Sequence, residues 1–378
     1  MEKTYGISCH VLITGGAGFI GSHLASELMR HGYRVRVLDN LSPHIHGSEK
    51  KRPKYLDPEV QLVIGDVRDP DAVRRALKGI DAVYHLAAVA GVGQSMYQIA
   101  EYTTINHLGT AVLLEQLTQQ RVQRLVVASS MSIYGEGLYR APDGTTCTGI
   151  ERTADQLKAA DWQARNAAGE VLTAIPTPET KPPSLASVYS LSKYDQERMC
   201  LMVGRAYGIP TVALRFFSVY GPNQELCNSN AGVLASFASR LLNGKPPVIY
   251  EDGHQQRDFV SVYDVARGCH QALEADAAAG QVINIGSGHR YTIRAVAQRF
   301  ARVLGKEDLK PEITRKYRMG DIRHCFADIS LARQVLGYRP QVSLEEGLQD
   351  LAEWYELQAA QDRVAEAGEE LAVRQLIA

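Results

Sequence analysis

Short apolar runs alternate with amphipathic stretches over the first two-thirds of the chain. We expect the runs to form strands at 10–14, 33–38, 61–67, 81–88, 124–130 and 211–217. Helices are expected between them at 22–32, 72–77, 102–119 and 189–207, where apolar side chains recur with helical spacing. Alternation of strand and helix predicts an α/β fold built on a doubly wound parallel sheet.

Two segments depart from this alternation. Residues 136–186 form a long insertion rich in Thr, Pro, Gly and Ala, within which 154–168 are expected to form a helical turn or two. Residues 357–378 combine helical periodicity with balanced charge and are expected to form a peripheral C-terminal helical tail.

Composition and charge narrow the class of protein. The 378 residues include 41 basic and 42 acidic side chains, with a net charge of −1 and no basic tract, so neither nucleic acid nor a membrane surface is expected as partner. No apolar run reaches about 18 residues and the start is polar, which predicts a cytoplasmic protein without a membrane span or signal peptide. The six cysteines are scattered, so we expect neither disulfides nor a metal site.

A glycine-rich turn joins the first expected strand to the first helix. Gly15, Gly18 and Gly21 allow a tight turn, close approach of the backbone to a pyrophosphate, and close packing of helix on strand. The second strand ends at Asp39 and Asn40, where an acid can bind ribose hydroxyls and would repel a 2′-phosphate. The pattern predicts a dinucleotide site that prefers NAD to NADP.

Tyr189 and Lys193 stand four residues apart, which places both on one face of the expected helix. A neighbouring cation favours the phenolate and lowers the pKa of a tyrosine. The pair is therefore a candidate general base for removing a proton from an alcohol. The spacing alone is common in helices, so its weight depends on the motifs around it.

These motifs follow one another as in a known superfamily. The chain resembles the extended short-chain dehydrogenases/reductases, specifically the NAD-dependent nucleotide-sugar epimerases and dehydratases. The likeness runs from about residue 10 to residue 356 and is carried by 15–21, 39–40, 65–67, 85–88, 106 with 109–110, 129–135, 189 with 193, 220–222 and 257–260. It implies a Rossmann-type domain, bound NAD, and a homodimer formed by a four-helix interface from helices 102–119 and 189–207.

The resemblance also implies which residues act. Ser130, Tyr189 and Lys193 match the catalytic set, in which the serine binds the reacting sugar oxygen and the lysine binds the nicotinamide ribose and lowers the pKa of the tyrosine. The positions that match cofactor contacts are Gly15, Gly18, Phe19, Ile20, Gly21, Asp39, Asn40, Asp66, Val67, Leu86, Ala87, Ala88, Asn106 and Phe216, together with Tyr189 and Lys193.

On the substrate side, the resemblance implies a nucleoside diphosphate sugar. Arg257 and Arg318 resemble two diphosphate-binding arginines, and the planar guanidinium suits phosphate oxygens. Asp321 is expected to bind ribose or the Arg318 side chain, and Tyr250 to pack on the base. Ser218 stands where many relatives have asparagine, which leaves one substrate contact in doubt.

The implied division of the chain has three parts. Residues 1–217 with about 256–287 are expected to bind NAD and to contain the insertion 136–186. Residues 218–255 with 288–356 are expected to form a smaller C-terminal α/β region that binds the nucleotide sugar. Residues 357–378 form the tail.

The residues after Ser130 indicate which of the reactions known in the superfamily this chain is expected to catalyse. Dehydratases and decarboxylases carry an acid there, whereas this chain has Met131 and Ser132, so we expect reversible oxidation and inversion at C4. The insertion and the run 202–215 look most like the bacterial dTDP-L-rhamnose 4-epimerase group, although a cysteine pair frequent in that insertion is absent here. A UDP-glucose or UDP-glucuronate 4-epimerase, a nucleotide-sugar dehydratase, and an NAD-binding regulatory module stay open.

Overall fold

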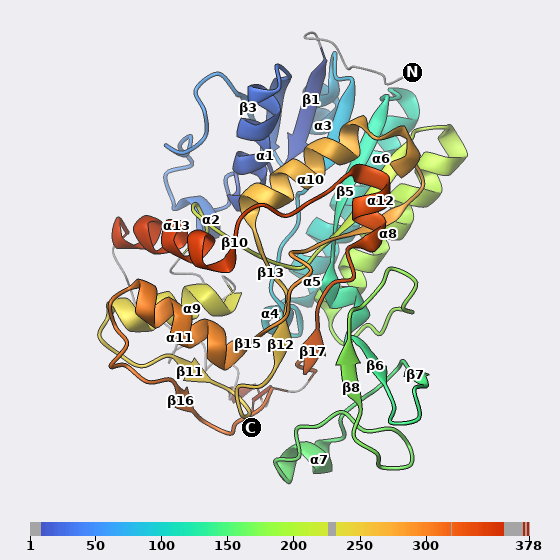
Figure 1. Ribbon diagram of the computed structural model, residues 1–378. Helices are drawn as coiled ribbons and strands as arrows, with labels where there is room; N and C mark the ends of the chain where they lie inside the picture. Colours follow the sequence, from blue (N-terminus) through green and yellow to red (C-terminus); the bar gives the residue numbers. More distant parts are fainter. Residues whose placement is uncertain (1–8, 226–231, 319, 359–372, 375, 378) are drawn as a thin grey trace.

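A seven-stranded parallel sheet forms the centre of the computed structural model, which describes residues 9–225, 232–318, 320–358, 373–374 and 376–377 (Figure 1). The strands are β1 (His10–Thr14), β2 (Arg34–Asp39), β3 (Gln61–Ile64), β4 (Ala82–His85), β5 (Arg124–Ser130), β9 (Thr211–Phe216) and β14 (Val282–Ile285). Their order is β14-β9-β5-β4-β1-β2-β3, so the sheet grows outward in both directions from β1 and β4. This confirms the predicted doubly wound sheet, whose ligands bind beyond the carboxyl ends of the strands.

Helices cover both faces of the sheet. One face carries α1 (Phe19–Arg30), α10 (Val262–Glu274) and α12 (Ser330–Leu336), and the other carries α3 (Pro70–Leu77), α6 (Gly109–Gln119) and α8 (Val188–Tyr207). Successive side chains of β1 point to opposite faces of the sheet, so Val11 and Ile13 belong to the core on the first face and Leu12 to the core on the second. Such burial on both faces explains why the strands read as continuous apolar runs.

Smaller elements follow the sheet strands and build a second region with a core of its own. Its strands pair as β10 (Ser218–Tyr220) with β13 (Phe259–Ser261), β11 (Val248–Ile249) with β16 (Glu312–Ile313), and β12 (Gln256–Arg257) with both β15 (Tyr291–Thr292) and β17 (His324–Cys325). Helices α9 (Gly232–Leu242), α11 (Ile293–Val303) and α13 (Leu344–Glu356) enclose a third cluster around Phe237, Phe300 and Leu351. The remaining short elements are α2 (Pro43–His46), α4 (Val92–Ser95), η2 (Met131–Tyr134) and η3 (Asp276–Ala278).

Most element boundaries differ from the expected ones by one to three residues. Helix α1 begins at Phe19, three residues early, because Gly18 caps it and its carbonyl accepts the Ser22 N–H at 2.9 Å. Strand β3 ends at Ile64, so Asp66 and Val67 lie in the loop beyond it. Strands β1 and β5 have the predicted bounds.

The expected helix 102–119 consists of three pieces: α5 (Ile99–Tyr102), a π-helical turn η1 (Thr103–Leu108) and α6. Asn106 lies in the π turn, and its side chain accepts the Val89 N–H at 2.8 Å and donates to the Val89 carbonyl at 3.1 Å. A second N–H of the same amide donates to Ser192 Oγ at 2.9 Å. The wider turn thus fixes a buried side chain between two other segments, a frequent use of π-bulges.

The insertion 136–186 is folded. Strands β6 (Leu138–Arg140), β7 (Thr146–Cys147) and β8 (Thr173–Ile175) form an antiparallel sheet that the sequence did not predict, and α7 (Ala154–Lys158) confirms the expected helical turn. Tyr139 and Leu172 pack with Phe326 of the second region in a small apolar cluster. The insertion is therefore attached to the part of the chain expected to bind substrate.

The predicted C-terminal tail at 357–378 lies mostly outside the described residues. Within its described part, Ile377 forms a β-bridge with Arg318, and the Arg374 guanidinium lies 4.1 Å from the centre of the Tyr97 ring. Among the described helices, none is both long and apolar enough to cross a membrane.

Candidate active site

The glycine-rich turn leaves bare backbone at the start of α1. Gly15 has a φ of +70°, and a Cβ there would lie 2.8 Å from the backbone N and Cα of Ala87. A Cβ on Gly21 would lie 2.5 Å from Gly16 Cα, whereas one on Gly18 meets only the Gly15 carbonyl at 3.4 Å. Gly15 and Gly21 are thus required by packing, while Gly18 leaves an open side where a pyrophosphate fits against the helix N-terminus.

Two carboxylates lie at the carboxyl ends of neighbouring strands: Asp39 is the last residue of β2, and Asp66 lies two residues beyond β3. Asp39 accepts the backbone N–H groups of Ala17 at 3.0 Å and Leu41 at 2.9 Å, so it braces the glycine turn. Burial raises the pKa of Asp39, and these hydrogen bonds and the nearby His46 oppose that shift. Asp66 accepts from Asn40 at 3.1 Å and from Arg68, which lowers the pKa of Asp66 to about 2. Both acids are held in place beyond the sheet.

The other residues predicted to contact the cofactor occupy the same edge. Phe19 and Ile20 open α1, Leu86, Ala87 and Ala88 follow β4, Val67 follows β3, Phe216 ends β9, and Asn106 lies in the π turn. The structure therefore brings the predicted set to the carboxyl ends of the strands, as expected for a dinucleotide site.

The predicted catalytic residues converge from β5 and α8. Ser187 caps α8 in a reciprocal pair with Ser190, which places Tyr189 in the first turn and Lys193 one turn later. Ser130 ends β5, and its side chain lies near enough to the Tyr189 phenol to lower the pKa of that phenol. The structure thus brings Ser130 and Tyr189 to neighbouring positions, while their catalytic roles stay a prediction.

Lys193 is buried and directed toward an amide. Its Nζ donates to Gln196 Oε1 at 2.6 Å, and Gln196 Nε2 donates to Thr110 Oγ1 at 2.8 Å. The Thr110 hydroxyl donates to the Asn106 carbonyl at 2.6 Å, and His85 Nε2 lies 2.8 Å from Thr110 Oγ1 and 3.2 Å from Gln196 Nε2. Burial lowers the pKa of Lys193 to about 8 and that of His85 to about 3.

The network continues to the glycine turn. The other ring nitrogen of His85, Nδ1, is hydrogen-bonded to the Thr14 hydroxyl at 2.8 Å. Thr14 Oγ1 in turn accepts the Ala87 N–H at 3.3 Å. Hydrogen bonds thus connect the end of β1 to the catalytic helix. The sequence motifs included His85 without a role, and Gln196 carried no signal in a single sequence.

In the chain without its ligands, the pKa of Tyr189 is raised and not lowered. Burial raises the pKa of Tyr189, and the hydrogen bond from Ser130 only partly opposes that effect. Lys193, which was expected to lower the pKa of Tyr189, directs its amine to Gln196 instead. In the chain alone, desolvation therefore outweighs the charge of the lysine.

A buried ion pair fixes the catalytic helix on the sheet. Glu197 of α8 binds Arg215 of β9 through two hydrogen bonds of 2.7 and 2.9 Å, and it accepts the Ser129 hydroxyl at 2.6 Å. Ser129 directly precedes Ser130, so the same contacts define the spacing of β5 and α8. Sequence analysis missed this pair, because burial of a charge cannot be inferred from isolated positions.

The predicted diphosphate residues lie together but are paired differently from expectation. Arg257 Nη2 lies 3.7 Å from Asp321 Oδ1, so the partner of Asp321 is Arg257 and not Arg318. The Arg318 guanidinium lies 4.4 Å from the centre of the Tyr250 ring, a cation–π contact. Tyr250, expected to pack on the base, thus has one face covered by an arginine.

Buried charges join the insertion to this region. Arg152 binds Glu251 at 2.7 Å and the Asp321 carbonyl at 2.8 Å, and Arg323 binds Glu251 at 2.9 Å. Glu136 accepts the Arg323 N–H at 2.7 Å and the Tyr139 hydroxyl at 2.6 Å. The insertion is therefore an integral wall beside Tyr250 and Asp321, a role that sequence analysis did not assign.

The residues after Ser130 carry no carboxylate. The Ser132 hydroxyl donates to Ser130 Oγ at 3.0 Å, and the Ser218 hydroxyl contacts Met131 Sδ at 3.8 Å. Ser132 and Ser218 thus line the vicinity of Ser130 with hydroxyl groups, and Met131 adds an apolar thioether. This arrangement lacks the acid that an elimination of water needs at those two positions.

With this geometry, comparison with known proteins defines the family. The chain belongs to the NAD dependent epimerase/dehydratase family, whose model matches residues 11–155 and 164–286, and this confirms the predicted NAD cofactor. It is 35% identical over 350 residues to a dTDP-L-rhamnose 4-epimerase of Burkholderia thailandensis, covering 91% of this chain and 94% of that one. It is also 31% identical over 346 residues to a putative UDP-glucose 4-epimerase of Methanocaldococcus jannaschii, covering 91% and 97%.

Solved structures agree with this assignment. A UDP-glucose 4-epimerase of Thermotoga maritima with UDP-glucose superposes with a TM-score of 0.76 at 31% identity, covering 92% of this chain and 98% of that one. A UDP-glucuronic acid 4-epimerase of Bacillus cereus with UDP-glucuronic acid and NAD gives 0.75 at 28% identity, covering 92% and 99%. The Rossmann-type fold is thus shared with enzymes that act on nucleotide sugars.

The glycine turn generates a paired prediction. Gly21→Ala places a methyl group against Gly16 and should destabilise the fold by about 1–3 kcal/mol. Gly18→Ala should cost about 1 kcal/mol or less, since its φ of −78° suits any residue, yet weaken NAD binding about tenfold or more. Urea unfolding and NAD titration of the NAD-free protein measure the two effects, and equal effects of both substitutions would contradict the assignment of Gly18.

The low pKa of Lys193 generates a second prediction. Between about pH 8 and about pH 10 the folded amine has lost its proton while the unfolded one keeps it, so the free energy of unfolding rises with pH in this window. The gain is about 1.4 kcal/mol for each unit by which the pKa is lowered. Urea unfolding of NAD-free protein should show this rise relative to Lys193→Met; a difference between the two proteins that stays constant with pH would rule it out.

Proposed function

We propose that the protein is an isomerase that inverts C4 of a nucleoside diphosphate sugar. The observation that carries this proposal is the convergence of Ser130 and Tyr189, together with the exposed backbone of the glycine turn at the same edge of the sheet. The hydroxyl and thioether groups at positions 131 and 132 favour inversion over dehydration. The names of the relatives, among them 4-epimerases of dTDP-L-rhamnose, UDP-glucose and UDP-glucuronic acid, support the same reaction.

The mechanism follows from the positions of three side chains. Bound NAD supplies a reversible hydride acceptor. Tyr189 removes the proton of the C4 hydroxyl, and Ser130 donates a hydrogen bond to that oxygen as it becomes a carbonyl. After the 4-keto sugar has turned over in the site, Tyr189 returns the same proton to the oxygen on the other face. Lys193 holds a positive charge one helical turn from the phenol and favours its ionisation when turned from Gln196 toward the ribose.

We infer that the two regions divide the ligands. Residues 1–217 with about 256–287 bind NAD, and residues 218–255 with 288–356 bind the nucleotide sugar. Arg257 and Arg318 are proposed to neutralise the diphosphate, and Asp321 positions Arg257. Arg318 would leave Tyr250 as the diphosphate enters, which would free the ring to stack on the base. A dTDP-linked 6-deoxyhexose such as dTDP-L-rhamnose is the first substrate we propose, supported by the relative at 35% identity.

The proposed assembly is a homodimer. Apolar side chains are exposed on the outer helices, namely Ile99, Leu108, Leu191 and Met202. They lie on α5, η1 and α8, which matches a four-helix interface. We also infer a reducing compartment such as the cytoplasm, because the described cysteines are free thiols. Sedimentation equilibrium should give twice the chain mass, and the mass of a single chain would count against the dimer.

Incubation with candidate sugar nucleotides tests the reaction. Purified protein should convert dTDP-L-rhamnose to its C4 epimer, seen by NMR at H4, without accumulating NADH. UDP-glucose and UDP-glucuronic acid serve as competing substrates, and a higher kcat/KM for either would change the sugar but not the reaction. Release of a 4-keto-6-deoxy product would contradict epimerisation.

Tyr189→Phe tests the proposed acid–base group. Removal of the phenolic oxygen should reduce kcat about 10²–10⁴-fold, the range for a lost general acid–base residue, while NAD binding is retained. Tyr194→Phe, five residues further along the same helix, is the matched control and should retain activity. Comparable losses in the two variants would indicate a structural effect of the substitution and not the loss of a base.

A further inference from the structure

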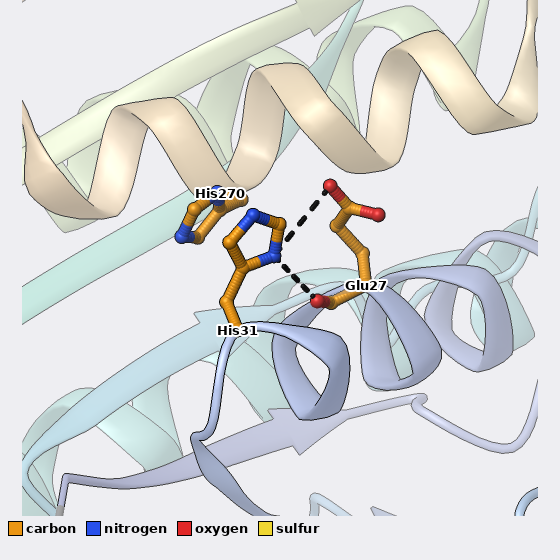
Figure 2. Close-up of side chains that lie close together, drawn as sticks. All are labelled: Glu27, His31 and His270. Carbon is orange, nitrogen blue, oxygen red and sulfur yellow. Dashed lines mark hydrogen bonds and ion pairs between the residues drawn. The ribbon is translucent and has the colours of Figure 1, made fainter. Parts of the chain in front are cut away.

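The C-terminal ends of α1 and α10 meet at the edge of the sheet opposite the glycine turn. Both helices follow a carboxyl-edge loop and lead into parallel strands, so they run side by side and end at the amino edge. Glu27 and His31 lie one turn apart at the end of α1, and His270 lies in the last turn but one of α10 (Figure 2). Nothing in the proposed reaction uses these residues.

The three side chains present metal-binding atoms at short range. One ligand atom of each lies within 4.8 Å of the other two. The imidazole rings of His31 and His270 are stacked with centroids 3.9 Å apart and planes 30° apart. The side chains of Glu27 and His270 are only 5% and 9% exposed, whereas that of His31 is 46% exposed.

The hydrogen bonds leave ring nitrogens available. His31 Nδ1 lies 2.9 Å from the Glu27 carbonyl oxygen, which can only accept, so Nδ1 carries the proton and Nε2 the lone pair. Figure 2 shows that second nitrogen turned toward His270. A backbone carbonyl that fixes one ring nitrogen is the usual support of a metal-binding histidine. His270 Nε2 is buried and makes no hydrogen bond, although it lies 3.2 Å from Glu274 Oε1.

The charges where the ends of α1 and α10 meet favour the binding of a cation. Helix C-termini carry partial negative charge, and two of them converge here with the carboxylates of Glu27 and Glu274. Arg30 binds Glu27 Oε2 at 2.6 Å, but its side chain is 66% exposed and the second oxygen, Oε1, stays available.

We propose that Glu27, His31 and His270 form a site for a divalent transition-metal ion of the Zn²⁺ type. Two imidazoles and one carboxylate match the ligands that Zn²⁺ prefers. Metal–ligand distances of about 2.0–2.1 Å draw the ligand atoms closer than they lie now, and rotation of the exposed His31 ring supplies that movement. Water or Glu274 completes the coordination.

The role of the ion would be to clamp α1 to α10. The cluster is at the amino edge of the sheet, whereas the proposed chemistry is at the carboxyl edge, so the metal takes no part in hydride or proton transfer. An ion that binds the folded chain and not the unfolded one raises the stability of the fold. The clamp acts on α1, whose opposite end carries the glycine turn.

Metal titration of the tag-free, chelator-treated full chain tests the site. Co²⁺ should bind with a stoichiometry of one and give the visible absorption of a four- or five-coordinate ion, which Zn²⁺ then displaces. Zn²⁺ should also raise the midpoint of thermal unfolding. Both signals should be lost in His31→Ala, an exposed position where the substitution leaves the fold intact, and in Glu27→Gln.

His289→Ala is the control, since His289 is exposed and lies outside the cluster. It should bind Co²⁺ as the unsubstituted protein does. His270→Asn, which retains polarity at a buried position, should abolish the absorption band without abolishing bound NAD. Absence of a stoichiometric Co²⁺ band in the unsubstituted protein would overturn the proposal, and so would equal bands in His31→Ala and the control. Because the readout does not involve turnover, it is independent of the proposed function.

Discussion

The buried ammonium of Lys193 is the constraint on which the active-site architecture depends. A charge taken out of water is costly unless hydrogen bonds replace its solvent. A carboxylate as direct partner would stabilise the charge but also hold the amine on that acid. The chain uses a neutral amide instead, since Nζ donates to Gln196 Oε1 at 2.6 Å. The adjacent acid, Glu197, is already committed to Arg215 and Ser129. Lys193 thus stays charged near neutral pH and can exchange its partner.

The hydrogen bonds that the Gln196 side-chain amide requires fix the positions of several elements at once. Gln196 requires Thr110 as acceptor, Thr110 requires the Asn106 carbonyl, and His85 joins Thr110 to Thr14. These residues come from α8, α6, the π turn, β4 and β1, so the network is complete only when all five are in register. Its far end, Thr14, directly precedes the glycine turn. Cofactor site and catalytic helix are therefore positioned by one set of hydrogen bonds, and fully satisfied networks of this kind favour a single arrangement.

The features that could be predicted from the sequence are those that depend on local patterns of residues. Apolar runs placed β1 and β5 at their observed bounds, and the glycine spacing identified the turn whose backbone approaches Ala87. The motif order selected Ser130 and Tyr189 as one catalytic set, and the structure brings these two residues to neighbouring positions. Each of these features is encoded within a few residues or in a short ordered motif.

What the sequence could not predict depends on contacts between distant residues. The partner of Asp321 is Arg257, and the insertion is held by Arg152 and Glu251, whose pairing spans 99 residues of chain. The π turn at Asn106 arises because its amide must reach Val89 and Ser192. Likewise, Glu27 and His31 share one helix turn, but His270 joins them only through the packing of α10 on α1. Charge and polarity at single positions do not reveal such partners.

The raised pKa of Tyr189 fits a reaction that must run in both directions at one carbon. Tyr189 has to be ionised to accept the proton in the first half and has to hold that proton as the neutral phenol until it returns it in the second, so both forms must be accessible. Burial favours the protonated phenol, whereas the Ser130 hydrogen bond favours the phenolate. The charge of Lys193 favours the phenolate of Tyr189 only when its amine leaves Gln196. Since Gln196 binds the amine without neutralising it, the balance between the two forms can shift when ligands bind, and a base that also serves as an acid needs that property.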